Sequence, residues 1–108
     1  LTLCGGLSAA REISTLARLS HVRLSPHVWG GAVGLSAAVH FLAAQAPWPH
    51  SDNIPYPVLL EYDQGENALR DKLLKIPIPC IDGHLTVPEG PGLGIELDWD
   101  AVEEYRII

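Results

Sequence analysis

The stretch VRLSPHVWGG at residues 22–31 decides how this chain can fold. Its first residues are mostly apolar, a proline and a histidine follow, and two glycines then lead into another apolar segment. Proline has no amide hydrogen to donate to a sheet, so Pro26 suits the end of a strand. The pattern predicts a short buried strand over residues 22–25 that ends near His27 and turns at the glycines into a helix.

A second apolar stretch, VLLEYD at residues 58–63, predicts another buried strand, over residues 58–61, that ends at Glu61. Residues 1–4 have the character of the tail of a strand. Between these three stretches, the apolar spacing predicts helices over residues 9–19 and 32–45. The order strand, helix, strand, helix, strand is typical of an α/β fold with a parallel sheet and right-handed crossovers.

Polar residues occur where these strands are expected to end. In a parallel α/β barrel the strand ends on one face supply the catalytic residues. We therefore expect His27 and Glu61 to point into one site, with Trp29 close enough to form one of its walls. The alternatives are a structural histidine bonded to the backbone, a solvated carboxylate and a tryptophan that only packs.

The charge and length of the chain limit its possible partners. The chain has 108 residues, 47% of them hydrophobic, and a net charge of −6. This negative charge argues against nucleic acid or an anionic membrane surface as a partner. The longest apolar run, residues 32–46, is too short to span a bilayer. We expect a cytoplasmic protein whose acidic second half faces solvent.

The two cysteines, Cys4 and Cys80, are far apart in sequence and show no metal-binding spacing. Two cysteines could form a disulfide, but nothing in the sequence suggests secretion. We therefore expect both to be buried thiols.

The chain changes character after Asp63. Before the strand at residues 58–61 we expect a proline-rich loop at residues 47–57, and after that strand a short helix over residues 68–74 that starts from Glu66 or Asn67. Extended chain over residues 75–80, a turn at Asp82-Gly83 and a strand over residues 84–87 predict a hairpin. A final helix, starting from Asp98 or Asp100, is expected to end near Tyr105. We divide the chain into barrel-like units at residues 1–74 and a tail at residues 75–108.

Five short motifs resemble the C-terminal third of the enolase superfamily, in its mandelate racemase subgroup. They are CGG at residues 4–6, SPHVWG at 25–30, LEYD at 60–63, DGH at 82–84 and PGLG at 91–94. The resemblance implies the C-terminal portion of a modified TIM barrel, from the end of the sixth strand through the eighth unit. It also implies that the tail packs on an N-terminal capping domain. Three strands cannot close a barrel, so we expect a portion of a larger protein.

The resemblance also implies roles for individual residues. His27 matches the seventh-strand histidine that acts as general base or acid, and Glu61 matches the eighth-strand glutamate that contacts the substrate carboxylate. The aspartate that orients the histidine would precede Leu1. Some relatives have a lysine base on the sixth strand, at the position of Leu3, so the histidine-base relatives are favoured.

The implied activity is abstraction of the proton next to a carboxylate, with Mg²⁺ stabilising the resulting enediolate. The metal ligands would lie on the third to fifth strands, outside this chain, so no metal ligand is expected among its residues. We expect an acid-sugar dehydratase that forms a homo-oligomer and whose isolated C-terminal portion is inactive. The alternatives are a racemase or epimerase of 2-hydroxy acids, a barrel that binds without catalysing, and a small autonomous binding domain.

Overall fold

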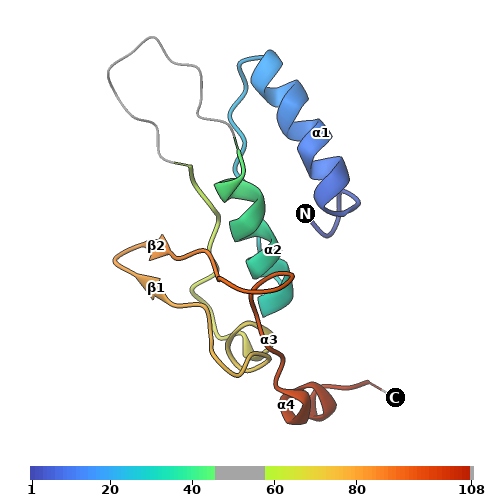
Figure 1. Cartoon of the computed structure of the whole chain (residues 1–108), viewed down its shortest axis with the longest axis vertical. Coiled ribbons are helices and arrows are strands. Elements are labelled where there is room, and N and C mark those ends of the chain that lie inside the picture. Colours follow the sequence, from blue (N-terminus) through green and yellow to red (C-terminus); the bar gives the residue numbers. More distant parts are fainter. Residues whose placement is uncertain (46–57, 108) are drawn as a thin grey trace.

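Helix α2 (Ala32–Ala43) lies at the centre of the molecule, between α1 (Gly6–Leu19) and the C-terminal half of the chain (Figure 1). This is a computed structural model, and it describes residues 1–45 and 58–107. The remaining elements are α3 (Ala68–Asp71), β1 (Cys80–Ile81), β2 (His84–Leu85) and α4 (Trp99–Glu104). The loop expected at residues 47–57, which includes His50, lies outside the described residues.

Helix α1 begins earlier than expected because two glycines form its entry. Gly5 has a φ of 103° and Gly6 a φ of 87°, a region that glycine adopts without steric cost. Residues 2–5 form a turn, closed by a 3.0 Å hydrogen bond from the Gly6 amide to the Leu1 carbonyl oxygen. The predicted strand tail at residues 1–4 is therefore wrong at the level of local structure.

The end of α1 is a Schellman motif. The Val22 amide donates to the carbonyl oxygen of Ala17 at 2.8 Å, and the His21 amide donates to that of Arg18 at 3.2 Å. His21 takes the left-handed conformation that this motif requires, with a φ of 57°. The chain thereby reverses and runs back along α2.

Helix α2 is apolar on nearly all sides, as expected for a helix covered by other elements. Its Ala32, Leu35 and Val39 pack with Leu74 and Ile78 in one cluster of buried side chains. Its Phe41 and Leu42 form a second cluster with residue Ala10 of α1. Because α2 contacts partners on several sides, it holds both halves of the described chain together.

The segments at residues 22–29 and 58–64 are extended and lie side by side. Ser25 contacts Leu59 and His27 contacts Glu61, so the contacts advance in the same direction and the segments are parallel. Neither contains an assigned strand, which corrects the two predicted strands. A ladder needs repeated amide–carbonyl bonds. Within the described residues, the one such bond between the two segments runs from the Glu61 amide to Pro26, at 3.3 Å.

The predicted hairpin is present but short. Strand β1 pairs antiparallel with β2, and Asp82 and Gly83 both have positive φ at the turn, 50° and 75°. Positive φ at both central residues is the geometry of a type I′ turn. Helix α3 is capped by the Asn67 side chain and α4 by that of Asp98, which settles both alternatives left open by the sequence.

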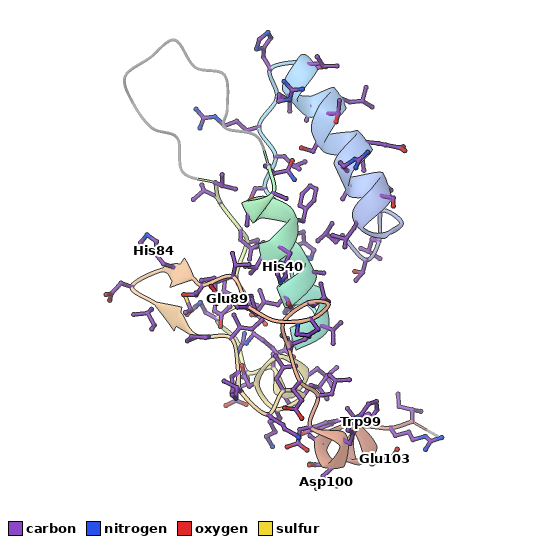
Figure 2. All side chains as sticks on the ribbon, in the orientation of Figure 1. His40, His84, Glu89, Trp99, Asp100 and Glu103 are labelled. Carbon is purple, nitrogen blue, oxygen red and sulfur yellow. The ribbon has the colours of Figure 1, made fainter. Side chains whose placement is uncertain are left out.

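The C-terminal residues return to α2. The Leu93 carbonyl oxygen accepts hydrogen bonds from Ser36 Oγ at 2.9 Å and His40 Nε2 at 3.0 Å. Figure 2 shows His40 on α2 near the loop that carries Glu89. Leu74 and Leu97 form an isolated antiparallel bridge. Packing of the tail on a capping domain stays a prediction, as does the division at residues 74 and 75.

Cys4 and Cys80 are both exposed free thiols, so the prediction that they are buried is wrong. Cys4 lies in the turn before α1, and Cys80 lies on a two-residue strand whose outer face has no covering layer in the described chain. Among the described residues, no helix has the length and apolar character needed to cross a bilayer.

Candidate active site

The two extended segments have one covered face and one exposed face. Leu24 and Val28 of the first segment, and Leu60 and Tyr62 of the second, pack against the two core clusters. Successive side chains of extended chain point to opposite sides. The residues that alternate with these packed side chains therefore face away from the helices, and all five are exposed. They are Ser25, His27, Trp29, Leu59 and Glu61.

His27 and Glu61 meet on this exposed face. His27 Nδ1 lies 2.5 Å from Glu61 Oε2, a hydrogen-bonded contact and an ion pair when the imidazole is protonated. The two side chains are 59% and 55% exposed, so the pair is open on the side facing away from the helices. The structure therefore brings together the two residues that the sequence predicted to share a site.

The use of Nδ1 has a chemical consequence. Of the two ring nitrogens, the one that carries hydrogen is set by the hydrogen bond that it makes. An ionised Glu61 can only accept a hydrogen bond, so Nδ1 is the donor and carries the hydrogen. The neutral imidazole then has its free lone pair on Nε2. Nε2 is then the nitrogen that can take a proton from another molecule.

Trp29 lies next to this pair. Its ring meets that of His27 edge to face, with centroids 6.4 Å apart and planes at 82°. The indole is 73% exposed, which is unusual for so large an apolar side chain. Trp29 is thus placed to form a wall beside the imidazole.

Contacts with the backbone fix the register of the two segments. Ser25 Oγ donates to the Leu59 carbonyl oxygen at 3.0 Å, and the Glu61 amide donates to the Pro26 carbonyl oxygen at 3.3 Å. A shift by one residue would turn Glu61 toward the helices. These two bonds therefore keep both candidate catalytic side chains on the same face.

Two further residues support the loops beyond the pair, and sequence reasoning did not single out either for the site. The sequence indicates Asn67 only as a possible helix start, and it predicts no role for Arg70 in the site. Asn67 binds one backbone carbonyl oxygen of the loop that follows His27, and Arg70 binds two of the loop that follows Glu61. A sequence signal exists for Arg70, which follows the acidic Asp63 and directly precedes Asp71.

The remaining described histidines lie away from the pair. His40 Nε2 donates to the Leu93 carbonyl oxygen inside the fold, so this histidine has a structural partner away from the pair. His84 is on the hairpin, and Trp99, Asp100 and Glu103 are on α4, well apart from His40 (Figure 2). In residues 1–45 and 58–107, no group of three or more His, Cys, Asp or Glu side chains is placed to hold a metal ion.

Comparison with known proteins identifies relatives along nearly the whole chain. D-galactarolactone cycloisomerase of Agrobacterium fabrum is 44% identical over 104 residues, which cover 96% of this chain and 27% of that protein. Arabinonate dehydratase of Saccharolobus solfataricus is 34% identical over 103 residues, 94% of this chain and 25% of that protein. The chain therefore spans about a quarter of the length of these relatives.

A solved structure matches the same region. The crystal structure of the 3,6-anhydro-D-galactonate cycloisomerase from Zobellia galactanivorans superposes with a TM-score of 0.74 at 42% identity, over 94% of this chain and 26% of that one. This match and a family model together confirm the predicted fold class, the C-terminal portion of the α/β barrel of enolase-superfamily enzymes. The model of the family described as "Enolase C-terminal domain-like" matches residues 1–101. The chain therefore belongs to the enolase C-terminal domain-like family.

Proposed function

We propose that this chain carries the acid–base side of an active site that removes the proton next to a sugar-acid carboxylate, in an enzyme that then eliminates water. The observation that supports this most directly is the 2.5 Å contact between His27 Nδ1 and Glu61 Oε2 on the exposed face of two parallel segments. It provides an imidazole with a fixed partner on one nitrogen and an accessible second nitrogen.

His27 Nε2 takes the α-proton, and the negative charge of Glu61 stabilises the imidazolium that forms. The electron pair of the broken C–H bond forms the carbon–carbon double bond as the β-hydroxyl leaves. The imidazolium gives its proton to that hydroxyl, which departs as water. The enol product rearranges to a 2-keto acid, so one water is lost, nothing is oxidised or reduced overall, and His27 is regenerated.

Glu61 is proposed to serve both His27 and the substrate. An ionised carboxylate has two oxygens and about four lone-pair sites. The contact from Oε2 to His27 uses one of these, which leaves capacity for a hydroxyl or carboxyl group of the substrate. Trp29 would form the wall beside Nε2 and limit the width of the substrate that fits.

The resemblance implies Mg²⁺, which would supply positive charge to the substrate carboxylate. The described residues of this chain do not fit that role, because they offer no metal-binding group of three. We propose that the ligands belong to strands outside this chain, and no step above depends on them. The rest of the barrel and a capping domain would complete the pocket of a homo-oligomeric, cytoplasmic enzyme.

Cycloisomerisation is a second candidate. It is favoured because the D-galactarolactone cycloisomerase is 44% identical to this chain and the arabinonate dehydratase 34%. A proton moved by His27 beside a carbonyl group serves either outcome. The products differ, since a dehydratase releases water and a cycloisomerase gives a product of the same composition as its substrate.

Solvent exchange tests the proposal in the full-length protein. We incubate it in deuterium oxide with arabinonate or with D-galactarolactone and follow the α-position and the products by NMR and mass spectrometry. His27→Asn removes the acid–base group and should lower deuterium incorporation and turnover about 10²–10⁴-fold. A 2-keto acid product identifies dehydration, and a product that has lost no water and differs in mass from its substrate only by incorporated deuterium identifies isomerisation.

The matched control is His21→Asn. His21 is also exposed, and asparagine tolerates its positive φ of 57°, so this variant should keep wild-type exchange. Undiminished exchange in a folded His27→Asn variant would overturn the role of His27. Absence of exchange and turnover by the wild type with a broad panel of sugar acids would favour the non-catalytic barrel.

A further inference from the structure

Asn67, just before α3, joins the loop after His27 to the loop after Glu61. Its Nδ2 donates to the Gly30 carbonyl oxygen at 3.1 Å, and its Oδ1 accepts from the Arg70 amide at 3.1 Å. Gly30 lies three residues beyond His27. One amide side chain therefore ties the end of the His27 segment to the first turn of α3.

Arg70 holds the residues that directly follow Glu61. Its Nη1 donates to the Asp63 carbonyl oxygen at 2.5 Å, and its Nη2 donates to that of Gly65 at 3.0 Å. The Tyr62 ring lies 5.4 Å from the guanidinium carbon, within the range of a cation–π contact. Arg70 thus contacts the loop at three points within four residues of Glu61.

The guanidinium itself is fixed in place. Its Nε and Nη2 bind the Asp71 carboxylate at 2.7 and 2.9 Å, and the Asp63 carboxylate lies 3.5 Å from Nη1. The Arg70 side chain is only 13% exposed. A planar group held on several sides loses little further freedom when it binds a loop, so it is suited to hold a fixed geometry.

The two segments benefit from such support because, between residues 22–29 and 58–64 as the structure describes them, the direct backbone connection is sparse. The Glu61 amide reaches Pro26 at 3.3 Å, beyond the usual N–H···O range. The contact between His27 and Glu61, by comparison, is short at 2.5 Å. A displacement of Glu61 by about 1 Å would take this contact out of hydrogen-bond range.

We propose that Arg70 and Asn67 are positioning residues that hold Glu61 against His27 Nδ1 and thereby fix the tautomer of His27. The importance of that tautomer rests on the proposed function, because only a lone pair on Nε2 can accept the substrate proton. The placement of the two side chains, however, can be tested without any substrate.

The tautomer is measured on the full-length protein with ¹⁵N-labelled imidazole rings. Long-range ¹H–¹⁵N spectra at alkaline pH distinguish hydrogen on Nδ1 from hydrogen on Nε2. We expect His27 to carry hydrogen on Nδ1 in the wild type and to lose this preference in the reference variant Glu61→Ala. Arg70→Met should move the spectrum most of the way to that reference, and Arg70→Lys should move it part of the way.

Asn67→Asp separates the two bonds that Asn67 makes. Aspartate is a good helix cap, so the α3 cap remains, but its carboxylate has no hydrogen to donate to Gly30. We expect this variant to lose the Nδ1–H preference while keeping the wild-type circular dichroism. Arg106→Met is the matched control, since Arg106 is 66% exposed on the far C-terminal segment and pairs with Glu103; it should keep the wild-type tautomer.

The proposal is overturned if folded Arg70→Lys and Asn67→Asp variants keep the wild-type tautomer, or if the wild type itself carries hydrogen on Nε2. If Arg70→Met does not fold, the Arg70→Lys and Asn67→Asp variants decide the question. Failure of the proposed function is a separate result. It would appear as undiminished deuterium exchange in His27→Asn, with the tautomer of the wild type and of the Arg70 and Asn67 variants as stated above.

Discussion

The carbonyl oxygen of Leu93 accepts two hydrogen bonds from α2, and its neighbour Gly94 has no room for a side chain. Gly94 has a φ of 65°, and a Cβ built there would lie 2.6 Å from the Pro88 carbonyl oxygen. The clashing oxygen is a backbone atom of Pro88, so it cannot move aside as the end of a flexible side chain could. The loop that brings Leu93 to Ser36 and His40 therefore requires glycine at position 94.

Gly94→Ala should destabilise the protein by roughly 2–4 kcal/mol, the sum of left-handed backbone strain and a backbone clash. Gly92→Ala is the matched control, because Gly92 has the same φ of 65° but no atom within 4 Å of its Cβ position. That control should lose only about 1–2 kcal/mol. The midpoints of thermal unfolding of the two variants measure the difference, and equal midpoints would show that the clash relaxes at no cost.

Contacts between side chains can be predicted from sequence more easily than contacts between a side chain and the backbone. His27 and Glu61 each follow an apolar run, and a parallel arrangement brings such positions together, so their pairing was predictable. The acidic residues near Arg70 indicate its ion pairs, but not its hold on the loop, because that depends on the carbonyl oxygens of Asp63 and Gly65. Any residue has a carbonyl oxygen, so no residue type in the sequence marks such a partner.

At the scale of elements, prediction succeeded where local chemistry determines the structure. The Asp82-Gly83 turn and the caps at Asn67 and Asp98 depend on the few residues around them. The strands expected at residues 22–25 and 58–61 depend instead on neighbours on both sides. Apolar residues such as Val22, Leu59 and Val58 are exposed in the described structure, and apolar content alone cannot supply a ladder.

The contact between residues 74–75 and 96–97 offers a test by pH. Lys75 Nζ lies 2.5 Å from Glu96 Oε1, beside the Leu74–Leu97 bridge. The hydrogen bond with Glu96 raises the pKa of Lys75 above its ordinary value. A lysine whose pKa is higher in the folded than in the unfolded chain stabilises the folded state. This stabilisation is fully present below the pKa of the unfolded chain, about 10.4, and is lost as the pH rises through the pKa of the folded state.

Lys75→Met should therefore lower stability slightly at pH 7–9, and the effect should be small because both side chains are largely exposed and solvent screens the pair. The difference from the wild type should vanish at still higher pH. Chemical denaturation at several pH values measures it, with Glu89→Gln as a control for the loss of an exposed carboxylate. A difference that persists unchanged through the alkaline range would assign the effect to packing of the lysine stem.

At the scale of the whole molecule, the chain is less compact than its length would allow. Its radius of gyration is 15.3 Å, whereas a compact domain of this length has about 13 Å. Its accessible surface is 8018 Å², compared with about 5,900 Å² for a compact monomer of this mass. The excess is comparable to the area of a stable protein–protein interface.

Part of this excess is apolar surface on α1. Leu16 and Leu19 are 65% and 66% exposed, whereas Ala10 is the buried residue of that helix. The helix is amphipathic, so its sequence predicts a covered face, and in the described structure α2 covers only part of it. We expect this surface to be covered by barrel elements outside this chain.

Expression of residues 1–108 alone tests this expectation. An exposed apolar helix face favours association. The isolated chain should therefore sediment as a mixture of monomers and oligomers that depends on concentration, and it should bind a hydrophobic dye. Replacing Leu16 and Leu19 together with glutamine should reduce both effects, whereas Arg11→Gln, an exposed change on the same helix, should not. A monomer that unfolds in one cooperative transition would instead identify an autonomous small domain, because such a transition requires a core that closes without further strands.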